Sequence, residues 1–483
     1  MRPVGYQQHN ATVPHPFDYP LDPKLLQATK PDHFRFISHS FFTGFQIGKH
    51  QRGIMKDMMH LLRLVLFVVA FVSTPTSASL ESRSSQQKHH DIFARHSSHQ
   101  HHRRAPAVSA RINSPLIYSK YDTSSATYRT NSYPHLTSAS GSWSWVGNDW
   151  WTSGFFPGTL YLLNERSKKC PGKTNVDWLA RARKWSEGLV PLESSNSVGH
   201  DTGFLAYPFL SELKVNPNNA TAKAGVKAFA AQLANRFDST VGCTRSWDSS
   251  YPDFLVIIDN MMNLELLYEA AKLFTGLDKY YDIAASHAST TAVHHLRPDA
   301  SSYHIVDYDQ RDGSIIYQHT GQGYADWSTW SRGQAWGTYG FAMMYNHTSY
   351  AGYLDVARRM GQKWLSRLAE DSSGVPKWDF DAPEPAPKDT SAATIASVAF
   401  LQLYYAESSR GNSTGATYWR DNAVKVLSAT ADQYFQTSTS WNALLSNGTS
   451  NKPSNVYNTG LVYGDYYFVK AGNMMLDLGL IGC

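Results

Sequence analysis

The 483-residue sequence predicts an all-α fold over residues 106–483, most simply a closed α/α barrel built from helical hairpins. Three observations lead to this prediction. Helical periodicity dominates from residue 157 on, no stretch sustains the alternation of a strand, and an aromatic–alanine pair recurs along the chain. The body of roughly 375 residues is long enough for one large domain with a substantial core.

The periodicity is clearest between residues 226 and 237. Val226, Phe229, Ala230, Leu233 and Phe237 follow the spacing of one buried helix face. Short stretches that alternate apolar and polar residues, such as 315–319, are expected only as hairpins at loop tips. The segment therefore predicts a helix that packs one face on a neighbour.

An aromatic residue stands four positions before an alanine at four places. The pairs are Trp178/Ala182, Tyr280/Ala284, Tyr353/Ala357 and Trp419/Ala423. Residues four apart share a helix face, and the small alanine lets a second helix approach closely. Successive pairs are 102, 73 and 66 residues apart, enough for two helices and a loop. Coincidence in an alanine-rich chain is the alternative; as a true repeat, the pairs predict stacked helical hairpins, ten to twelve helices in all.

Five segments between the predicted helices are unusually rich in aromatic and polar residues. They are 143–157, 196–204, 244–263, 303–336 and 374–391. Loops held by a rigid scaffold commonly carry the chemistry of a protein. We therefore expect the functional site to be built from these segments at one end of the barrel.

The first 105 residues differ from the rest. They hold 13 Lys and Arg against 6 Asp and Glu, whereas the remainder holds 31 against 33. The body thus lacks the basic character expected of a nucleic-acid-binding domain. Residues 1–54 are interpreted as a gene-model extension. Residues 55–78 have the layout of a signal peptide, with a charged start, a short apolar run and small residues at 76–78.

Residues 79–105 are rich in Ser, His and Arg and are interpreted as a disordered propeptide or stalk. The apolar run in the signal segment is too short to span a membrane, and nothing later approaches that length. The sequence therefore predicts a secreted protein with no membrane partner.

The three cysteines are too few for a disulfide framework and lack the spacing of a metal site. One disulfide, for which Cys170–Cys243 is the candidate, is compatible with an oxidising compartment. Four Asn-x-Ser/Thr sequons, which fit a secreted glycoprotein, begin at Asn219, Asn346, Asn412 and Asn447.

Two carboxylates stand out as candidate catalytic groups. Asp201 follows His200 and precedes a Thr-Gly-Phe sequence, and Asp259 follows the apolar run 254–258. A carboxyl group in apolar surroundings has a raised pKa, which suits a general acid. Each aspartate has an alternative role as a helix N-cap.

The segment 303–336 carries the densest set of candidate binding residues. Arg332 offers a planar fork that suits a carboxylate, and Trp330 and Trp336 flank it. The alternative for Arg332 is a structural ion pair. Trp151, next to Trp150, is a candidate platform for stacking a sugar, with core packing as its alternative. Residues 376–391 are either a wall of a second subsite or a buried connector.

Seven motifs in order resemble glycoside hydrolase family 88, the unsaturated glucuronyl hydrolases. They lie at 151–158, 200–204, 257–263, 301–304, 328–336, 378–383 and 463–468. The resemblance covers roughly residues 110–480 and implies a barrel of six α/α hairpins. It implies that 4,5-unsaturated glucuronic acid is removed from the non-reducing end of lyase-generated oligosaccharides, without a metal or organic cofactor.

The resemblance also implies roles for individual residues. Asp259 would protonate C4 of the sugar and help water add at C5, and Asp201 would order the sugar hydroxyls. Substrate-binding roles fall to Trp151, His200, His304, Gln322, Trp330, Arg332 and Trp336. The family pattern often has a histidine before the glutamine, where this chain has Gly321.

Three alternatives remain at the level of sequence. The first is an unsaturated rhamnogalacturonyl hydrolase, which shares the barrel and the chemistry. The second is a conventional inverting glycosidase with Asp201 and Asp259 as base and acid. The third is a secreted sugar-binding protein without catalysis, although a binding protein has no need of a desolvated acid.

Overall fold

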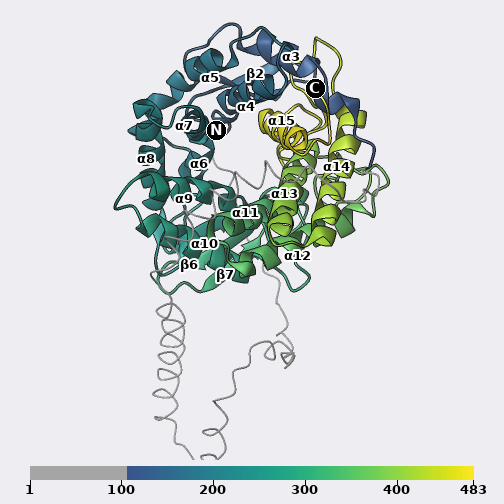
Figure 1. Cartoon of the computed structure of the whole chain (residues 1–483). Coiled ribbons are helices and arrows are strands. Elements are labelled where there is room, and N and C mark those ends of the chain that lie inside the picture. Colours follow the sequence, from purple (N-terminus) through teal and green to yellow (C-terminus); the bar gives the residue numbers. More distant parts are fainter. Residues whose placement is uncertain (1–105) are drawn as a thin grey trace, which may run out of the picture. The chain divides into compact units, whose positions relative to one another are not determined.

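The computed structural model describes residues 106–483, and the three predicted leader segments at 1–54, 55–78 and 79–105 lie outside the described residues. The described part is mostly helical. Figure 1 shows its helices arranged as a ring, with an inner and an outer layer. This arrangement agrees with the predicted all-α class.

The inner layer consists of helices that each contact the next around the ring. They are α4 (Phe155–Lys169), α6 (Thr202–Leu205) with α7 (Tyr207–Val215), α9 (Leu264–Leu273), α11 (Ser331–Thr348), α13 (Thr390–Ser409) and α15 (Val462–Asp477). Contacts between α15 and α4 close the ring. Helices α11 and α13 are buried nearly all round, as expected for helices with neighbours on every side.

The outer layer pairs one helix with each inner position. Its members are α3 (Leu116–Ser125), α5 (Trp178–Ser186), α8 (Ala220–Ala234), α10 (Lys279–His294), α12 (Ala351–Leu368) and α14 (Ser413–Tyr434). Each outer helix packs on the following or preceding inner helix, as α14 does on α13 and Tyr121 of α3 does on Phe156 of α4. The chain therefore forms six helical hairpins.

The aromatic–alanine repeat marks the outer layer. Its four pairs lie on α5, α10, α12 and α14, and every member is buried. Helix α8, which lies between the first two pairs, has Val226 four residues before Ala230. The first spacing of 102 residues therefore spans two hairpins.

One local expectation needs correction. Helix α8 ends at Ala234, so Phe237 lies in the short strand β3 (Phe237–Asp238) and is only half-buried. Helix α4 begins at Phe155, within the aromatic-rich segment 143–157. Pro157 lies in its first turn, where the missing N–H of proline has no partner to lose.

Strands are confined to the connecting segments. They are β1 (Ser132–Thr137), β2 (Trp143–Gly147), β3, β4 (Cys243–Thr244), β5 (Asp253–Ile257), β6 (Ile305–Asp309) and β7 (Ile315–His319). Strands β5, β6 and β7 form an antiparallel sheet in that order, with Asp253 opposite Asp309 and Ile305 opposite His319. The expected hairpin at 315–319 is confirmed.

The disulfide differs from the expected pairing. Cys170, which follows α4, bonds to Cys483 with their Cα atoms 5.3 Å apart. Cys243 is a free, buried thiol in a small apolar cluster with Phe254 and Val306. The prediction of Cys170–Cys243 was wrong, because Cys243 lies under α10, in a cluster that does not include Cys170.

None of the helices within residues 106–483 combines the length and the apolar character needed to cross a membrane.

Candidate active site

The N-terminal ends of the inner helices carry most of the predicted site. Asp201 precedes α6, Asp259 lies in the 3-10 turn before α9, and Arg332 is in the first turn of α11. Asp389 caps α13, and Tyr463 is in the first turn of α15. Because these helices form a closed ring and start at the same end of it, residues far apart in sequence lie in one place.

Neither catalytic candidate serves as a helix cap. Asp201 occupies the position before α6 but makes no side-chain capping hydrogen bond, and the turn of Asp259 has none either. Their side chains are 17% and 13% exposed. The capping alternatives are therefore excluded, and both carboxyl groups are nearly buried.

Burial sets the protonation of the two carboxyl groups. It raises the pKa of Asp259 to about 7, an effect that the nearby Arg332 guanidinium opposes. Burial raises the pKa of Asp201 well above its usual range, and the charge of Asp259 raises it further. The two groups thus interact electrostatically, and Asp259 is the one that titrates near neutral pH.

The ring of His304 is held in place by hydrogen bonds to its Nδ1. Its Nδ1 accepts hydrogen bonds from the backbone N–H groups of Gly321 (3.1 Å) and Gln322 (3.3 Å). The proton of the neutral ring therefore sits on Nε2, which lies 3.8 Å from Oδ2 of Asp259. Gly321, which stands where the family pattern often has histidine, contributes through its backbone.

His200 has the opposite arrangement. Its Nδ1 lies 2.9 Å from the carbonyl oxygen of Ser246 and must donate to it, since a carbonyl only accepts. Its Nε2 therefore carries a lone pair, 3.3 Å from Oδ1 of Asp201. Burial lowers the pKa of His200 to about 3 and that of His304 well below its usual range, so both rings are neutral.

Several buried polar atoms in this region have no hydrogen-bond partner among the described residues. They are His200 Nε2, Asp259 Oδ2, His304 Nε2 and Tyr463 Oη. Buried polar groups in proteins are nearly always paired. The two histidine nitrogens lie beside Asp201 and Asp259, a grouping that is typical of a site that a polar ligand completes.

Arg332 is 2% exposed and makes strong contacts within the protein. Its Nη1 pairs with Asp389 (2.6 Å to Oδ2) and with the carbonyl of Thr449, and its Nη2 donates to the carbonyl of Ser450 (2.6 Å). The structural ion pair considered from sequence is thus present. No hydrogen bond of Arg332 Nε is found among the described residues, so this N–H is a candidate donor to a substrate carboxylate.

The predicted aromatic residues divide into two groups. Trp330 lies 4.6 Å from the His304 ring, and Trp151 lies 5.0 Å from Tyr463, measured between ring centroids. Trp336 is 1% exposed and packs between Phe204 and Tyr467 in the core. Trp330 and Trp151 thus adjoin the site, whereas Trp336 supports the core beneath it.

Gln322 donates from Nε2 to the carbonyl of Ser450 (3.2 Å). Ser450 thereby joins the loop of Gln322 to Arg332. Its carbonyl had no sequence signal, because any residue supplies one.

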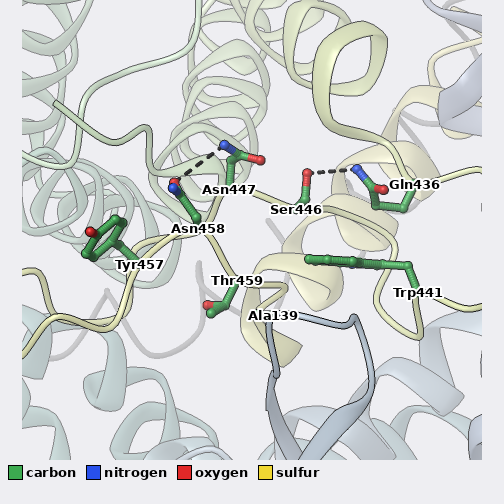
Figure 2. A pocket seen from close by; sticks show the side chains of 8 residues that line it. All are labelled: Ala139, Gln436, Trp441, Ser446, Asn447, Tyr457, Asn458 and Thr459. Carbon is green, nitrogen blue, oxygen red and sulfur yellow. Dashed lines mark hydrogen bonds between the residues drawn. The ribbon is translucent and has the colours of Figure 1, made fainter. Parts of the chain in front are cut away.

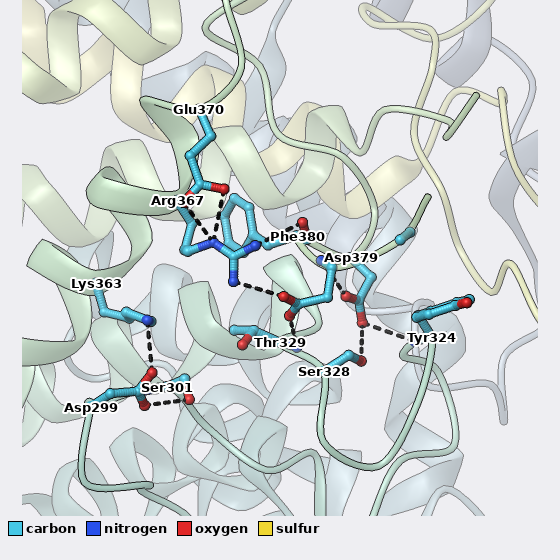
Figure 3. A network of polar contacts seen from close by, with 12 residues as sticks. Asp299, Ser301, Tyr324, Ser328, Thr329, Lys363, Arg367, Glu370, Asp379 and Phe380 are labelled. Carbon is cyan, nitrogen blue, oxygen red and sulfur yellow. Dashed lines mark hydrogen bonds and ion pairs between the residues drawn. The ribbon is translucent and has the colours of Figure 1, made fainter. Parts of the chain in front are cut away.

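Two aspartates of the segment 376–391, Asp379 and Asp381, bind the loop 324–329; this pair is called the Asp379 clamp. Oδ2 of Asp379 accepts hydrogen bonds from the backbone of Tyr324 (2.9 Å) and the hydroxyl of Ser328 (2.7 Å). Asp381 accepts from the backbone of Thr329 and pairs with Arg367 (both 2.8 Å). Figure 3 shows this network. The buried-connector interpretation is therefore supported, and the clamp fixes the loop that carries Gln322.

Trp247 was not singled out from the sequence. Its ring lies 5.8 Å from that of His304 and is 38% exposed, so it forms part of the site's rim. A tryptophan inside the aromatic-rich segment 244–263 was the available signal.

A separate cavity of about 510 Å³ lies beside the hairpin 446–460, lined by Trp441, Tyr457 and polar side chains (Figure 2). None of the predicted site residues lines it. Within residues 106–483, no group of three or more His, Cys, Asp or Glu is placed to hold a metal ion.

A ring of six α/α hairpins with two buried carboxyl groups at one end defines an α/α-barrel hydrolase of the carbohydrate-active kind. No protein-family model matches the chain. The chain is 39% identical over 329 residues to the unsaturated glucuronyl hydrolase of Formosa agariphila, covering 66% of this chain and 78% of the relative. It is 34% identical to the unsaturated chondroitin disaccharide hydrolase of Streptococcus pneumoniae, covering 52% and 63%.

Solved structures of similar fold point to the same enzymes as the sequence relatives. An unsaturated glucuronyl hydrolase specific for heparin superposes with a TM-score of 0.69 at 29% identity, covering 77% of this chain and 97% of that chain. The enzyme from Bacillus sp. GL1 gives a TM-score of 0.69 at 27% identity, covering 76% and 96%. The chain belongs to the unsaturated glucuronyl hydrolases, glycoside hydrolase family 88.

Proposed function

We propose that this protein removes 4,5-unsaturated glucuronic acid from the non-reducing end of short oligosaccharides by hydrating the C4=C5 double bond. The observation that carries the proposal is the pair of nearly buried carboxyl groups, Asp201 and Asp259, among unpartnered polar atoms. A vinyl ether needs a proton donor at carbon, and a carboxylic acid with a pKa near 7 is protonated at mildly acidic pH.

The proposed reaction begins with transfer of the Asp259 proton to C4. Positive charge then develops at C5 and on the ring oxygen, and water adds at C5 while the Asp259 carboxylate takes a proton from it. The product is a hemiketal at C5. It opens to a ketone, which leaves a hemiacetal at C1, and this hemiacetal expels the rest of the oligosaccharide as an alcohol.

The uronate carboxylate, attached to C5, lies next to the carbon that reacts. The groups near Asp259 that can donate to it are His304 Nε2–H, which has no partner among the described residues, and the Arg332 guanidinium. Guanidinium and carboxylate form strong, directional pairs. On the other side, His200 Nε2 and Asp201 are suited to accept from sugar hydroxyls.

The relatives favour this reaction over the alternatives. Those reported are named for unsaturated glucuronyl or unsaturated chondroitin disaccharide hydrolysis, and none for rhamnogalacturonan or for saturated glycosides. Their names and the solved structures mention chondroitin, heparin and glycosaminoglycan. Lyase products of such acidic polysaccharides are therefore the first substrates to test.

The test follows the ultraviolet absorbance of the unsaturated uronate. The purified protein is expected to remove this absorbance in step with release of the second sugar, and to leave the matched saturated disaccharide intact. Cleavage of the saturated disaccharide would support the inverting glycosidase. Binding without turnover of any member of a panel of lyase products would support the sugar-binding alternative.

We also propose that the protein is secreted and N-glycosylated. The Cys170–Cys483 disulfide supports this, since such bonds persist in oxidising compartments, as do the four sequons. Expression of the full chain in a eukaryotic secretory host should yield protein in the medium whose mass falls on removal of N-glycans. Retention of unglycosylated protein inside the cells would contradict the proposal.

A further inference from the structure

Helix α10 carries a line of polar residues that the proposed reaction does not use. His287 and Thr291 on α10 and His295, which directly follows its last residue, are spaced by four, and each is fully buried. Helix α10 buries these polar residues in addition to its aromatic–alanine pair, Tyr280 and Ala284. Fully buried histidines on an outer helix call for an explanation, because unpaired buried polar groups cost free energy.

The line faces the turn that carries Asp259. Thr244, in β4, donates its backbone N–H to Nδ1 of His287 (3.1 Å), and its hydroxyl lies 3.2 Å from the same nitrogen. Asn260, the neighbour of Asp259, donates from Nδ2 to the carbonyl and to the hydroxyl of Thr244 (both 2.9 Å). A chain of hydrogen bonds thus runs from α10 to the residue beside Asp259.

The proton positions along this chain are determined. Because Thr244 N–H donates to Nδ1, the neutral His287 ring carries its proton on Nε2. Asn260 donates to the Thr244 oxygen, so the hydroxyl proton of Thr244 points to His287. Burial lowers the pKa of His287 to about 3, which keeps this arrangement unchanged over the pH range in which Asp259 titrates.

A second hydrogen bond, from the end of α10, supports the same turn. His295 donates from Nε2 to the carbonyl of Val256 (3.1 Å), three residues before Asp259. His287 Nε2, Thr291 Oγ1, His295 Nδ1 and Asn260 Oδ1 are buried and have no hydrogen-bond partner among the described residues, so the His287 side chain reaches the turn through Nδ1 alone.

We propose that His287 is a positioning residue, which fixes the aim of the Asp259 carboxyl through Thr244 and Asn260. The proposal rests on the proposed function, in which Asp259 is the acid. No contact of His287 reaches Asp201, Asp259 or Arg332 directly, so its effect on the reaction passes through the turn. Small displacements of a catalytic group change the rate more than the binding of substrate.

The test compares His287→Leu with His287→Asn. Leucine removes the acceptor, whereas asparagine places its Oδ1 near the position of Nδ1 and can keep the bonds from Thr244. We expect His287→Leu to lower kcat by about 10- to 100-fold with little change in KM, and His287→Asn to recover most of kcat. Thr244→Val, which removes only the hydroxyl, should lower kcat in the same manner if His287→Leu fails to fold.

Cys243→Ala is the matched control. Cys243 adjoins Thr244 and is fully buried, and its thiol reaches only the backbone carbonyl of His287 (4.0 Å), so its side chain takes no part in the side-chain bonds from His287 through Thr244 to Asn260. It should lower thermal stability and leave kcat unchanged. A folded His287→Leu or Thr244→Val variant with wild-type kcat would overturn the proposal, as would His287→Asn that regains stability without kcat. Failure of the wild-type protein to turn over unsaturated disaccharides would instead refute the proposed function.

Discussion

Asp259 and Asp201 show how one residue type acquires two roles from its surroundings. Arg332 opposes the rise in the pKa of Asp259, whereas the charge of Asp259 adds to the rise for Asp201. The sequence pointed to Asp259 as a desolvated acid because an apolar run precedes it. The state of His200 and His304 could not be predicted, since it depends on the carbonyl of Ser246 and on the backbone of Gly321.

The pH dependence of activity should follow Asp259. A general acid works only when protonated, so we expect kcat/KM to fall as pH rises through about 7. His200 and His304 stay neutral because burial lowers their pKa values, and burial raises the pKa of Asp201 well above its usual range. Initial rates across a pH series test this. An alkaline limb at the ordinary carboxyl pKa of about 4 would contradict it.

The same pKa predicts an effect on stability. The folded-state pKa of Asp259 lies above that of the unfolded chain, so the free energy of unfolding falls as pH rises between these two values and stays lower above the folded pKa. Asparagine cannot ionise. Asp259→Asn should therefore be more stable than wild type at about pH 8, by on the order of 1 kcal/mol or more. Denaturant unfolding at about pH 8 and pH 4 measures this, and an equal difference at both values would contradict it.

At the scale of elements, the repeat of aromatic and alanine predicted the outer helices because packing against a neighbour imposes a local pattern. The roles of the loops were harder to predict from the sequence. Segment 376–391 had two interpretations from sequence, and only contacts across more than fifty residues, such as Asp379 with Tyr324 and Ser328, distinguish them. The ion pair of Arg332 could not be predicted for the same reason, because its partner Asp389 lies on another hairpin.

The Asp379 clamp should act on substrate binding. Asp379→Asn removes one charged acceptor from the loop of Gln322, and a hydrogen bond to a charged group contributes about 1.5–3 kcal/mol. We expect KM for the unsaturated disaccharide to rise by about tenfold or more, with a smaller change in kcat. Lys363→Gln is the control, since its pair with the exposed Asp299 should contribute little. Equal kinetics in both variants would argue against the clamp.

At the scale of the whole molecule, contacts between α15 and α4 close the ring, and Figure 1 shows how it brings the inner helices around one centre. The six-hairpin count came from the resemblance to a family, because periodicity alone allowed ten to twelve helices. The disulfide could not be predicted, since Cys170 and Cys483 are 313 residues apart and meet only because the ring closes.

This disulfide should stabilise the closed ring. It joins the end of α4 to the C-terminal residue, which follows α15, so it links the two inner helices that complete the circle. Cys483→Ser should lower the free energy of unfolding by about 2–4 kcal/mol. Denaturant unfolding of wild type and variant, each with and without reductant, measures the effect. Equal midpoints for oxidised wild type and the variant would contradict it.

The role of Asp259 as the proton donor is tested most directly by the activity of Asp259→Asn toward an unsaturated disaccharide. Asparagine keeps the size and polarity of the side chain but cannot deliver a proton to C4. We predict that loss of the unsaturated absorbance slows by about 10²- to 10⁴-fold while the Kd for the disaccharide, measured by calorimetry, stays within a few-fold of wild type. Turnover close to that of wild type would contradict the assignment of Asp259 as the acid.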